Sequence, residues 1–567
     1  MYTNVIDVTS GSTSQRYCLD QGAYLDFPAS NPSTSVFKHP ERDTSNYRTA
    51  NPVLFAMVLR SSNSPLTSEL DALVQQQMDK WKVPGLSMAV VHGSSTWSKA
   101  YGFAKFPDRK MTTDSLFSTC STTKAFTAAA MSLAIDDSKN TESPLRWDTP
   151  IASILRDDFV LENDYSTMHT TIEDALSHRS GLSTHNTCLE LAHPQRSLRE
   201  AVRNLRHLPM AYAPRTTFSY NNNMYMVMSH ALEQIEGRTL GETLKKRIWD
   251  PLGMDDTYFS VTDVSQDPSL RPRLVQGYTW DPDTDTYVAE PYMNDVAVTG
   301  AGAMVSSVLE YTKWLRAMIY QTGPISPQGR AELLKPRTII TNWDELVGPP
   351  PAPCHLYALG WFVDSYRGEP FYWHSGSWPG FGIMVGFLPS KGFGFAMMGN
   401  TTNARNAQVE IYMHLLDRIF GGSGIPYSGG QATEAENRKI GTKSGCMEEA
   451  IKRLYPSLPD PVISHSLPLE QYAGKYENPA YGSITLSLGN GCLVADLLDR
   501  AVPCLITLAH VSGEFFVAHY YQPKTIGSLS DYCATEFIVG SNGITTAMGM
   551  DMEPALNGEK MWFDRKY

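Results

Sequence analysis

The pattern of apolar residues changes near Gly421. Before this point apolar residues recur at both helical and strand spacings, whereas from about Leu467 onward the spacing is that of strands alone. The stretch between them, GGSGIPYSGGQATEAENRK, is rich in glycine and serine and then charged, which is typical of a linker. A chain of 567 residues can bury more than one hydrophobic core. The sequence therefore predicts four parts: an N-terminal extension over 1–61, a mixed domain over 62–420, a linker over 421–465 and an all-β domain over 466–567.

Helical and strand spacings alternate in the mixed domain. Apolar residues recur at helical spacing over 69–81 and again over 224–235, where Gly237 follows as a stop signal. The run LSMAVV at 86–91 indicates a buried strand, and the two apolar runs within 382–398 indicate a buried hairpin. These patterns predict a domain that contains both helices and sheet.

Short alternating segments predict the β domain. Residues 483–488 (SITLSL) alternate strictly, Gly489-Asn490-Gly491 is a turn, and 492–497 continues the ladder. Similar short strands are expected at 514–521 and 535–539. A short helix is expected before them, around 447–454.

Charge and cysteine usage exclude several functional classes. The formal net charge is -12 and no long basic run occurs, so a nucleic-acid partner is not expected. The eight cysteines form neither a CxxC pair nor a Cys/His cluster at zinc spacing, which favours reduced thiols and predicts no metal and no cofactor.

The N-terminal region favours a soluble protein. The N-terminus lacks a basic start with an apolar stretch, and the early apolar run over 52–59 is too short to span a bilayer. We therefore expect a cytoplasmic protein with no membrane partner. Residues 1 to about 60, rich in Ser, Thr, Asn and Pro, are expected to lie along the surface or to be partly disordered.

The run LFSTCSTTKAFTAAAM contains a candidate nucleophile. Its apolar positions predict a helix that begins at Ser121, and a spacing of three then places Ser121 and Lys124 one turn apart on the same face. A serine hydroxyl needs an adjacent base, and a lysine whose pKa is lowered by burial or by a second cation can provide it. Alone, Ser-x-x-Lys also describes a helix cap followed by a solvated lysine.

Two further segments contain candidate site residues. In Tyr220-Asn221-Asn222, a tyrosine near the lysine cation is expected to lose its proton more easily and to relay protons, and Asn222 can hold a carbonyl. The alternative is that Asn222 only caps a helix and Tyr220 only packs.

In FYWHSGSWPGFG, the small residues of His374-Ser375-Gly376-Ser377 let a strand edge approach a substrate, although His374 could equally be structural. The segment LSHRSGL at 176–182 is interpreted as structural.

Together these motifs resemble the serine β-lactamase and penicillin-binding-protein superfamily, in the branch that holds class C β-lactamases, D-aminopeptidases, esterases and acyltransferases. The order of VPGLSMAVV, the Ser121 motif, LSHRSGL, Tyr220-x-Asn222, DPLGMDDTYF, GAGAMVSS and HSGSWPGFG is similar to that of the family over roughly 62–420. The resemblance implies an α/β (α+β) fold, with an antiparallel sheet flanked by helices beside a helical lobe. The segment QYAGKYENPAYGSITLSL resembles the lipocalin-like barrels attached to some of these enzymes.

The resemblance also implies roles for the site residues. Ser121 would be acylated, Lys124 and Tyr220 would act as general acid and base, and Asn222 would position the substrate. The N–H groups of Ser121 and Ser377 would form an oxyanion hole beside the strand edge that carries His374, Ser375 and Gly376.

His374 stands where β-lactamases and transpeptidases usually carry lysine. A histidine is mostly neutral at pH 7, which argues against the binding of β-lactam carboxylates. We therefore expect a serine hydrolase that acts on an ester, thioester or amide. The substrate would be a small molecule or short peptide, and could be bound to a carrier protein. An acyltransferase or cyclase that uses the same acyl-enzyme, and a non-catalytic binding protein on the same scaffold, remain open at this point.

Overall fold

A nine-stranded antiparallel sheet forms the centre of the mixed domain, with strand order β3-β2-β1-β13-β12-β11-β10-β9-β8. The computed structural model describes residues 64–292, 298–341, 354–422 and 446–567. The strands are β1 (Gly85–His92), β2 (Ser95–Lys105), β3 (Arg109–Lys110), β8 (Thr338–Ile339), β9 (Leu356–Tyr357), β10 (Phe362–Tyr366), β11 (Glu369–Trp378), β12 (Phe381–Leu388) and β13 (Phe393–Gly399). Because β1 pairs with β13 in the register Leu86↔Gly399, the first and last strands of the domain meet in the middle of the sheet.

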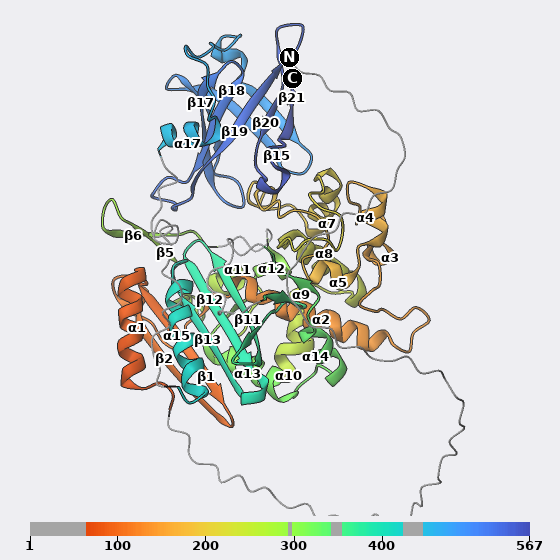
Figure 1. Cartoon of the computed structure of the whole chain (residues 1–567), viewed down its shortest axis with the longest axis vertical. Helices are drawn as coiled ribbons and strands as arrows, with labels where there is room; N and C mark the ends of the chain where they lie inside the picture. Colours follow the sequence, from red (N-terminus) through yellow and green to blue (C-terminus); the bar gives the residue numbers. More distant parts are fainter. Residues whose placement is uncertain (1–63, 293–297, 342–353, 423–445) are drawn as a thin grey trace, which may run out of the picture. The chain divides into compact units, whose positions relative to one another are not determined.

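Helices α1 (Ser68–Trp81) and α15 (Ala404–Ile419) cover one face of this sheet (Figure 1). The side chain of Thr67 caps α1 by accepting from the N–H of Leu70, and Lys82 ends the helix in the left-handed conformation. Apolar residues of both helices pack on β1, β12 and β13 to form one hydrophobic core. This core fixes the strand β12 and the start of α15, which both lie beside the candidate site.

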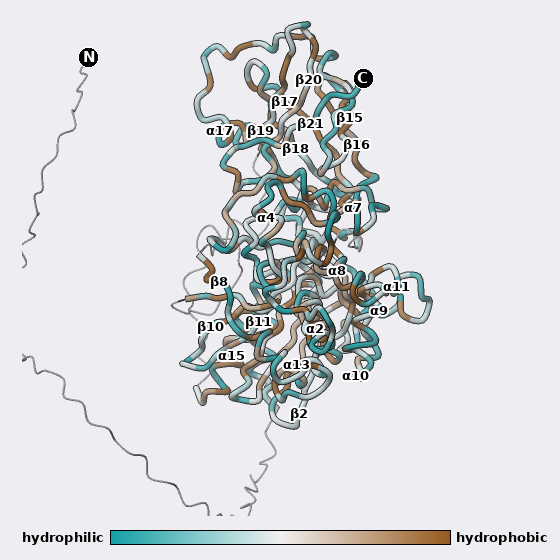
Figure 2. Tube along the Cα trace, turned by 90° about the vertical axis from the view of Figure 1, so that its right-hand side faces the viewer, coloured by the Kyte–Doolittle hydropathy of each residue, from teal (hydrophilic) through white to brown (hydrophobic). Residues whose placement is uncertain are grey.

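The other face of the sheet packs on α13 (Val308–Tyr320) and on a helical lobe. The lobe is centred on α2 (Thr123–Ser138) and α8 (Asn222–Glu236), with α12 (Thr299–Gly302) against both. Every residue of α2 from Thr123 to Ile135 is buried, so the helix is enclosed on all sides, and its trace can be followed in Figure 2. A helix this deeply buried is a rigid support for the residues at its N-terminus.

Shorter elements complete the mixed domain. They are the helices α3 (Ile151–Leu155), α4 (Asp164–His169), α5 (Ile172–Leu176), α6 (Thr187–Glu190), α7 (Leu198–Arg203), α9 (Leu240–Leu244), α10 (Asp250–Leu252), α11 (Val261–Gln266) and α14 (Pro327–Leu334), and the strand pairs β4 (Phe117–Ser118) with β7 (Val305–Ser306) and β5 (Tyr278–Asp281) with β6 (Thr286–Ala289).

The C-terminal part is a closed eight-stranded barrel. Its strands are β14 (Gly474–Asn478), β15 (Gly482–Gly489), β16 (Cys492–Leu497), β17 (Cys504–Ser512), β18 (Phe515–Tyr521), β19 (Ser530–Val539), β20 (Thr545–Met550) and β21 (Met561–Lys566), and closure comes from the pairing of β14 with β21. Aromatic side chains such as Phe516 and Phe537, with ring centroids 5.2 Å apart, are fully buried between the strands. Helix α17 (Met447–Leu454) packs on β18 and β19.

The fold class predicted from the sequence is confirmed, both for the antiparallel sheet with its helical lobe and for the barrel. The prediction for 1–61 lies outside the described residues, as does most of the predicted linker. Within the parts of the chain that the structure describes, we find no helix that is both long and apolar enough to cross a membrane.

Candidate active site

Ser121 lies in a tight turn between β4 and α2. The sequence predicts an α-helix that begins at Ser121, but the α-helix begins at Thr123, and Ser121 belongs to a preceding 3-10 turn, η1 (Cys120–Thr122). Cys120 is fully buried and has a φ of 50°, a conformation uncommon for a residue with a side chain. The turn is held in place because Thr119 N–H donates to the Met304 carbonyl (2.8 Å). The hydroxyl of Ser121 is thereby fixed at the start of a buried helix.

Lys124 is completely buried, and its amine has three partners. Nζ lies 2.7 Å from Oδ1 of Asn222, 2.9 Å from the carbonyl oxygen of Ala301 and 3.1 Å from Oγ of Ser121. Burial lowers the pKa of Lys124 well below its ordinary value, against a smaller opposing effect of Cys120. A neutral amine has two N–H groups and one lone pair. Since two of the three partners are carbonyl oxygens that can only accept, the lone pair is left for the hydroxyl proton of Ser121.

Tyr220 completes this group. Its side chain lies beside Ser121, and Nζ of Lys124 lies 4.8 Å from the centre of its ring. Burial raises the pKa of Tyr220, an effect that the neighbouring Ser121 only partly offsets. The expectation that a lysine cation would make this tyrosine more acidic is therefore wrong, because burial outweighs the charged and polar groups that lower its pKa. Tyr220 enters the site as a protonated phenol that can donate a hydrogen bond.

Asn222 does not cap helix α8, which was the alternative role that the sequence analysis left open. The cap of α8 is Asn221, whose side chain accepts from the N–H of Met224 (2.8 Å). Asn222 begins the helix, accepts from Lys124 through Oδ1 and donates through Nδ2 to Oδ1 of Asn186 (3.0 Å). Its first role is thus to orient Lys124, and the positioning of substrate by Asn222 stays a prediction.

The strand edge predicted around His374 lies beside the turn that carries Ser121. A Cβ placed on Gly376 would lie 2.7 Å from the carbonyl oxygen of Thr119, so only glycine lets β11 approach η1 this closely. His374 is 1% exposed; its Nε2 is hydrogen-bonded to the hydroxyl of Tyr357 (2.9 Å) and its Nδ1 to the carbonyl of Ser375 (2.6 Å). Burial, with a smaller effect of Lys124, lowers the pKa of His374 to about 3, so the ring is neutral at physiological pH.

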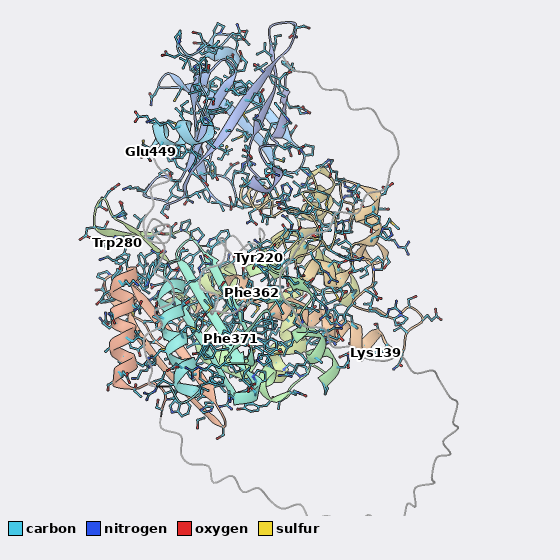
Figure 3. The ribbon with its side chains drawn as sticks, viewed as in Figure 1. Lys139, Tyr220, Trp280, Phe362, Phe371 and Glu449 are labelled. Atoms are coloured by element: carbon cyan, nitrogen blue, oxygen red, sulfur yellow. The ribbon has the colours of Figure 1, made fainter. Side chains whose placement is uncertain are left out.

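A cavity of about 400 Å³ lies in front of these residues. It brings together most of the residues predicted from the sequence: Ser121, Tyr220, Asn222, His374, Ser375 and Ser377 line it. Figure 3 labels Tyr220 and Phe362, which lie near each other on its wall. Lys124 is buried behind Ser121, and Gly376 is turned toward the η1 backbone rather than toward the cavity.

The sequence analysis missed several residues of this site. His178, in the segment interpreted as structural, lies against Tyr220 with ring centroids 4.2 Å apart, and its Nδ1 accepts from the N–H of Asn221 (2.9 Å). Arg405 lines the cavity, and its Nε is buried without a hydrogen-bond partner among the described residues. Burial lowers the pKa of Arg405 to about 10, so the cavity keeps a full positive charge although His374 is neutral. For His178, the sequence offered only its place in a segment that resembles a family motif. For Arg405, a single arginine outside any motif, the sequence offered no indication of a role in the site.

The same cavity is also lined by residues of the barrel, Glu553, Pro554 and Ala555. Nothing in the sequence predicts that residues so far along the chain reach Ser121.

Comparison with known proteins identifies this arrangement. Residues 70–417 match the model of the Beta-lactamase family. The chain belongs to the β-lactamase family. Residues 458–565 match a domain of unknown function (DUF3471) that corresponds to the barrel region.

Similar proteins include the unguisins hydrolase of Aspergillus campestris, 36% identical over 517 residues, which covers 89% of this chain and 93% of the relative. A D-aminopeptidase of Brucella anthropi is 29% identical over 194 residues, covering 33% of this chain and 35% of the relative. Among solved structures, the octameric penicillin-binding protein homologue from Pyrococcus abyssi is similar in fold, with a TM-score of 0.55, 20% identity and coverage of 87% of this chain and 99% of that one. These relatives establish that the chain is an enzyme of the serine hydrolase type.

The close approach of β11 to η1 gives a first prediction for this β-lactamase-family site. Gly376→Ala should lower kcat/KM by about 10²-fold, because the new Cβ forces the strand edge away from Ser121 and a displacement near 1 Å has this effect on reacting groups. The measurement is kcat/KM for a neutral ester. Gly302→Ala is the matched control, since its Cβ would lie 3.6 Å from Cys120, an ordinary contact. Equal rates in the two variants would contradict the argument.

The burial of Lys124 gives a second prediction, for stability. Unfolded Lys124 is protonated below its ordinary pKa of 10.5, whereas folded Lys124 stays neutral until the pH reaches its lowered pKa. Between these two pKa values the unfolded state binds the additional proton, so the contribution of Lys124 to stability falls as the pH falls, by at most about 1.4 kcal/mol per pH unit. Lys124→Met removes this contribution.

Urea unfolding of the wild type and Lys124→Met from about pH 6 to about pH 10 measures the effect. We expect the difference in free energy of unfolding to move in favour of the variant as the pH falls. A difference that does not change with pH would show that Lys124 is protonated in the folded protein.

Proposed function

We propose that this enzyme hydrolyses an unguisin or a closely related compound through an acyl-enzyme on Ser121. The observation that carries the proposal is the contact of the buried Lys124 amine with Ser121 Oγ at 3.1 Å, with Tyr220 lining the same cavity. The choice of substrate is supported by the similarity to an unguisins hydrolase along 93% of that relative's length.

In the first step Lys124 takes the hydroxyl proton of Ser121 as Oγ attacks the scissile carbonyl carbon. The N–H groups of Ser121 and Ser377 stabilise the oxyanion that forms, a role supported by the close packing of β11 on η1. The proton on Lys124 is then passed, with Tyr220 as the donor nearest the leaving group, to the departing nitrogen or oxygen. The bond to the leaving group breaks and Ser121 carries the acyl group.

In the second step water attacks the ester of Ser121. The same amine, now neutral again, accepts a proton from this water, and Ser121 leaves with a proton returned through the same pair. Asn222 holds the lysine lone pair toward Ser121 throughout, since its Oδ1 accepts one lysine N–H at 2.7 Å. The neutral His374, held by Tyr357, supports the strand edge beside the substrate.

Other assignments from the sequence stay proposals. The division into 1–61, 62–420, 421–465 and 466–567 is one, and a carrier-protein-bound substrate is another. A cytoplasmic location agrees with the free thiols of the seven cysteines within the described residues.

The test incubates the purified full-length protein with an unguisin and follows the product by mass spectrometry. Hydrolysis gives products whose summed mass is that of the substrate plus one water molecule, and Ser121→Ala should form no such products. A parallel panel of neutral esters, D-amino amides and penicillins defines the range. If these compounds form adducts at Ser121 but the unguisin is left unchanged, the acyl-enzyme proposal stands and the proposed substrate is refuted. No adduct with any compound would refute both.

A further inference from the structure

The barrel reaches the catalytic cavity through the connection between β20 and β21. This connection contains the short 3-10 turn η8 (Pro554–Leu556), and Glu553, Pro554 and Ala555 line the same cavity as Ser121. Glu553 is only 3% exposed. A carboxylate buried this deeply is costly unless hydrogen bonds satisfy its oxygens.

The partners of Glu553 are all in one loop of the mixed domain. Its carboxylate accepts from Oγ of Ser183 (2.6 Å), from Oγ1 of Thr184 (3.1 Å) and from the backbone N–H of His185 (2.6 Å). The ring of His185 is hydrogen-bonded to the hydroxyl of Tyr481 and to the carbonyl of Pro209, and its Nδ1 lies 3.8 Å from Oε2 of Glu553. The carboxylate therefore holds this loop by three short hydrogen bonds from groups that carry no charge.

The loop held by Glu553 also contacts the three asparagines that follow Tyr220. Nδ2 of Asn221 donates to the carbonyl of Ser183 (2.5 Å), and Nδ2 of Asn223 donates to the carbonyl of Thr184 (3.0 Å). Asn222, which orients Lys124, donates to Asn186 at the end of the same loop. A continuous set of hydrogen bonds thus leads from the barrel carboxylate to the asparagine that fixes the catalytic amine.

A second contact holds the barrel to the segment just after this loop. The N–H groups of Ala501 and Val502, in the connection between β16 and β17, donate to the carbonyls of Ala192 and Glu190, each at 2.9 Å. Two separate connections of the barrel therefore hold the polypeptide on either side of Asn186.

We propose that the barrel completes the active site. Glu553 acts as a positioning residue that holds the loop at 183–185, and Pro554 and Ala555 form a wall that limits the size of the substrate group bound near Ser121. Ala555 is small and half-buried, and the aromatic residues Tyr212, Phe218 and Phe362 line other parts of the cavity. Because polar side chains, Arg405 among them, line the remainder, the group accepted beside this wall has an apolar part that faces the aromatic rings and a polar part. The inference rests on the proposed acylation of Ser121.

The size limit is tested with two fluorophosphonates, one with a methyl and one with an octyl substituent, on the full-length protein. Rates of covalent labelling are measured by intact mass, and the labelled residue is identified by peptide mapping. Ala555→Trp should slow labelling by the octyl probe about tenfold or more and leave the methyl probe within about twofold, because the indole fills the space of the longer group. Ser541→Trp, in the exposed turn between β19 and β20, is the matched control and should change neither rate.

The positioning role is tested with the same two probes. Glu553→Ala should slow labelling by both, whereas Glu553→Gln should retain most of the rate, because its amide can accept from the N–H of His185 and donate to Ser183 Oγ. Thermal unfolding of each variant reports whether it is folded at the assay temperature.

The outcomes separate the two proposals. A wild type that neither probe labels at Ser121 refutes the acyl-enzyme itself. A labelled wild type with unchanged probe preference in Ala555→Trp refutes the size limit. Normal labelling of Glu553→Ala refutes the positioning role. If Glu553→Ala is unfolded at the assay temperature, the labelling rate of Glu553→Gln decides the positioning role. A folded Glu553→Gln protein that is labelled as slowly as an unfolded protein would overturn this role.

Discussion

Replacement of Ser121 by alanine should abolish turnover, with a fall in kcat on the order of 10⁴-fold or more. Ser121 carries the hydroxyl that Lys124 contacts at 3.1 Å and lines the same cavity as Tyr220, so its removal leaves the amine and the phenol with no nucleophile to activate. What remains is the catalysis that comes from binding and from the oxyanion hole. Turnover of a neutral ester and formation of an acyl adduct by intact mass are the two measurements.

The loss must come from chemistry and not from unfolding. Ser121 lies in the η1 turn, whose backbone is held through Thr119 and not through the serine side chain, so we expect the variant to keep the wild-type Tm within a few degrees. Ser132→Ala, in the buried helix α2 that follows this turn, lies about three turns away and should keep full activity. A Ser121→Ala protein with adducts or near-normal rates would show that another residue is acylated.

The sequence predicted those parts of the site that local spacing determines. A separation of three residues was enough to place Lys124 beside Ser121, although the turn there is 3-10 and the helix starts two residues later. The small size of Gly376 led us to expect a strand edge close to a substrate, and in the structure it instead lets β11 pack against the Thr119 carbonyl of the preceding turn. Alternation of apolar residues likewise predicted the barrel strands, because the period of two is a property of each strand by itself.

The contacts that the sequence could not predict join distant segments. The carbonyl of Ala301, which leaves only the lysine lone pair for Ser121, belongs to a different helix and has no side-chain signature. Which of the adjacent asparagines caps α8 depends on the backbone angle at Asn221, and this angle is fixed by the bond from its N–H to His178. Glu553 is one of many acidic residues along the chain. Only the docking of the barrel distinguishes it, by burying it against the loop at 183–185.

The positions of Lys124 and Tyr220 on either side of the Ser121 hydroxyl predict that they act as one unit. Lys124→Ala and Tyr220→Phe should each lower kcat/KM by about 10² to 10⁴-fold, because each removes a group that moves the serine proton. Their effects should not add. Once the amine that takes the proton is gone, the phenol that passes it onward has nothing left to contribute, so the double variant should be about as slow as the slower single one.

The measurement is a double-mutant cycle in kcat/KM for a neutral ester, with a second cycle as the control. Tyr455→Phe removes a hydroxyl that donates to the carbonyl of Phe516 in the barrel, and its small effect should simply add to that of Lys124→Ala. If the effects of Lys124→Ala and Tyr220→Phe add as freely as those of the control pair, the two groups act independently and the shared relay is refuted.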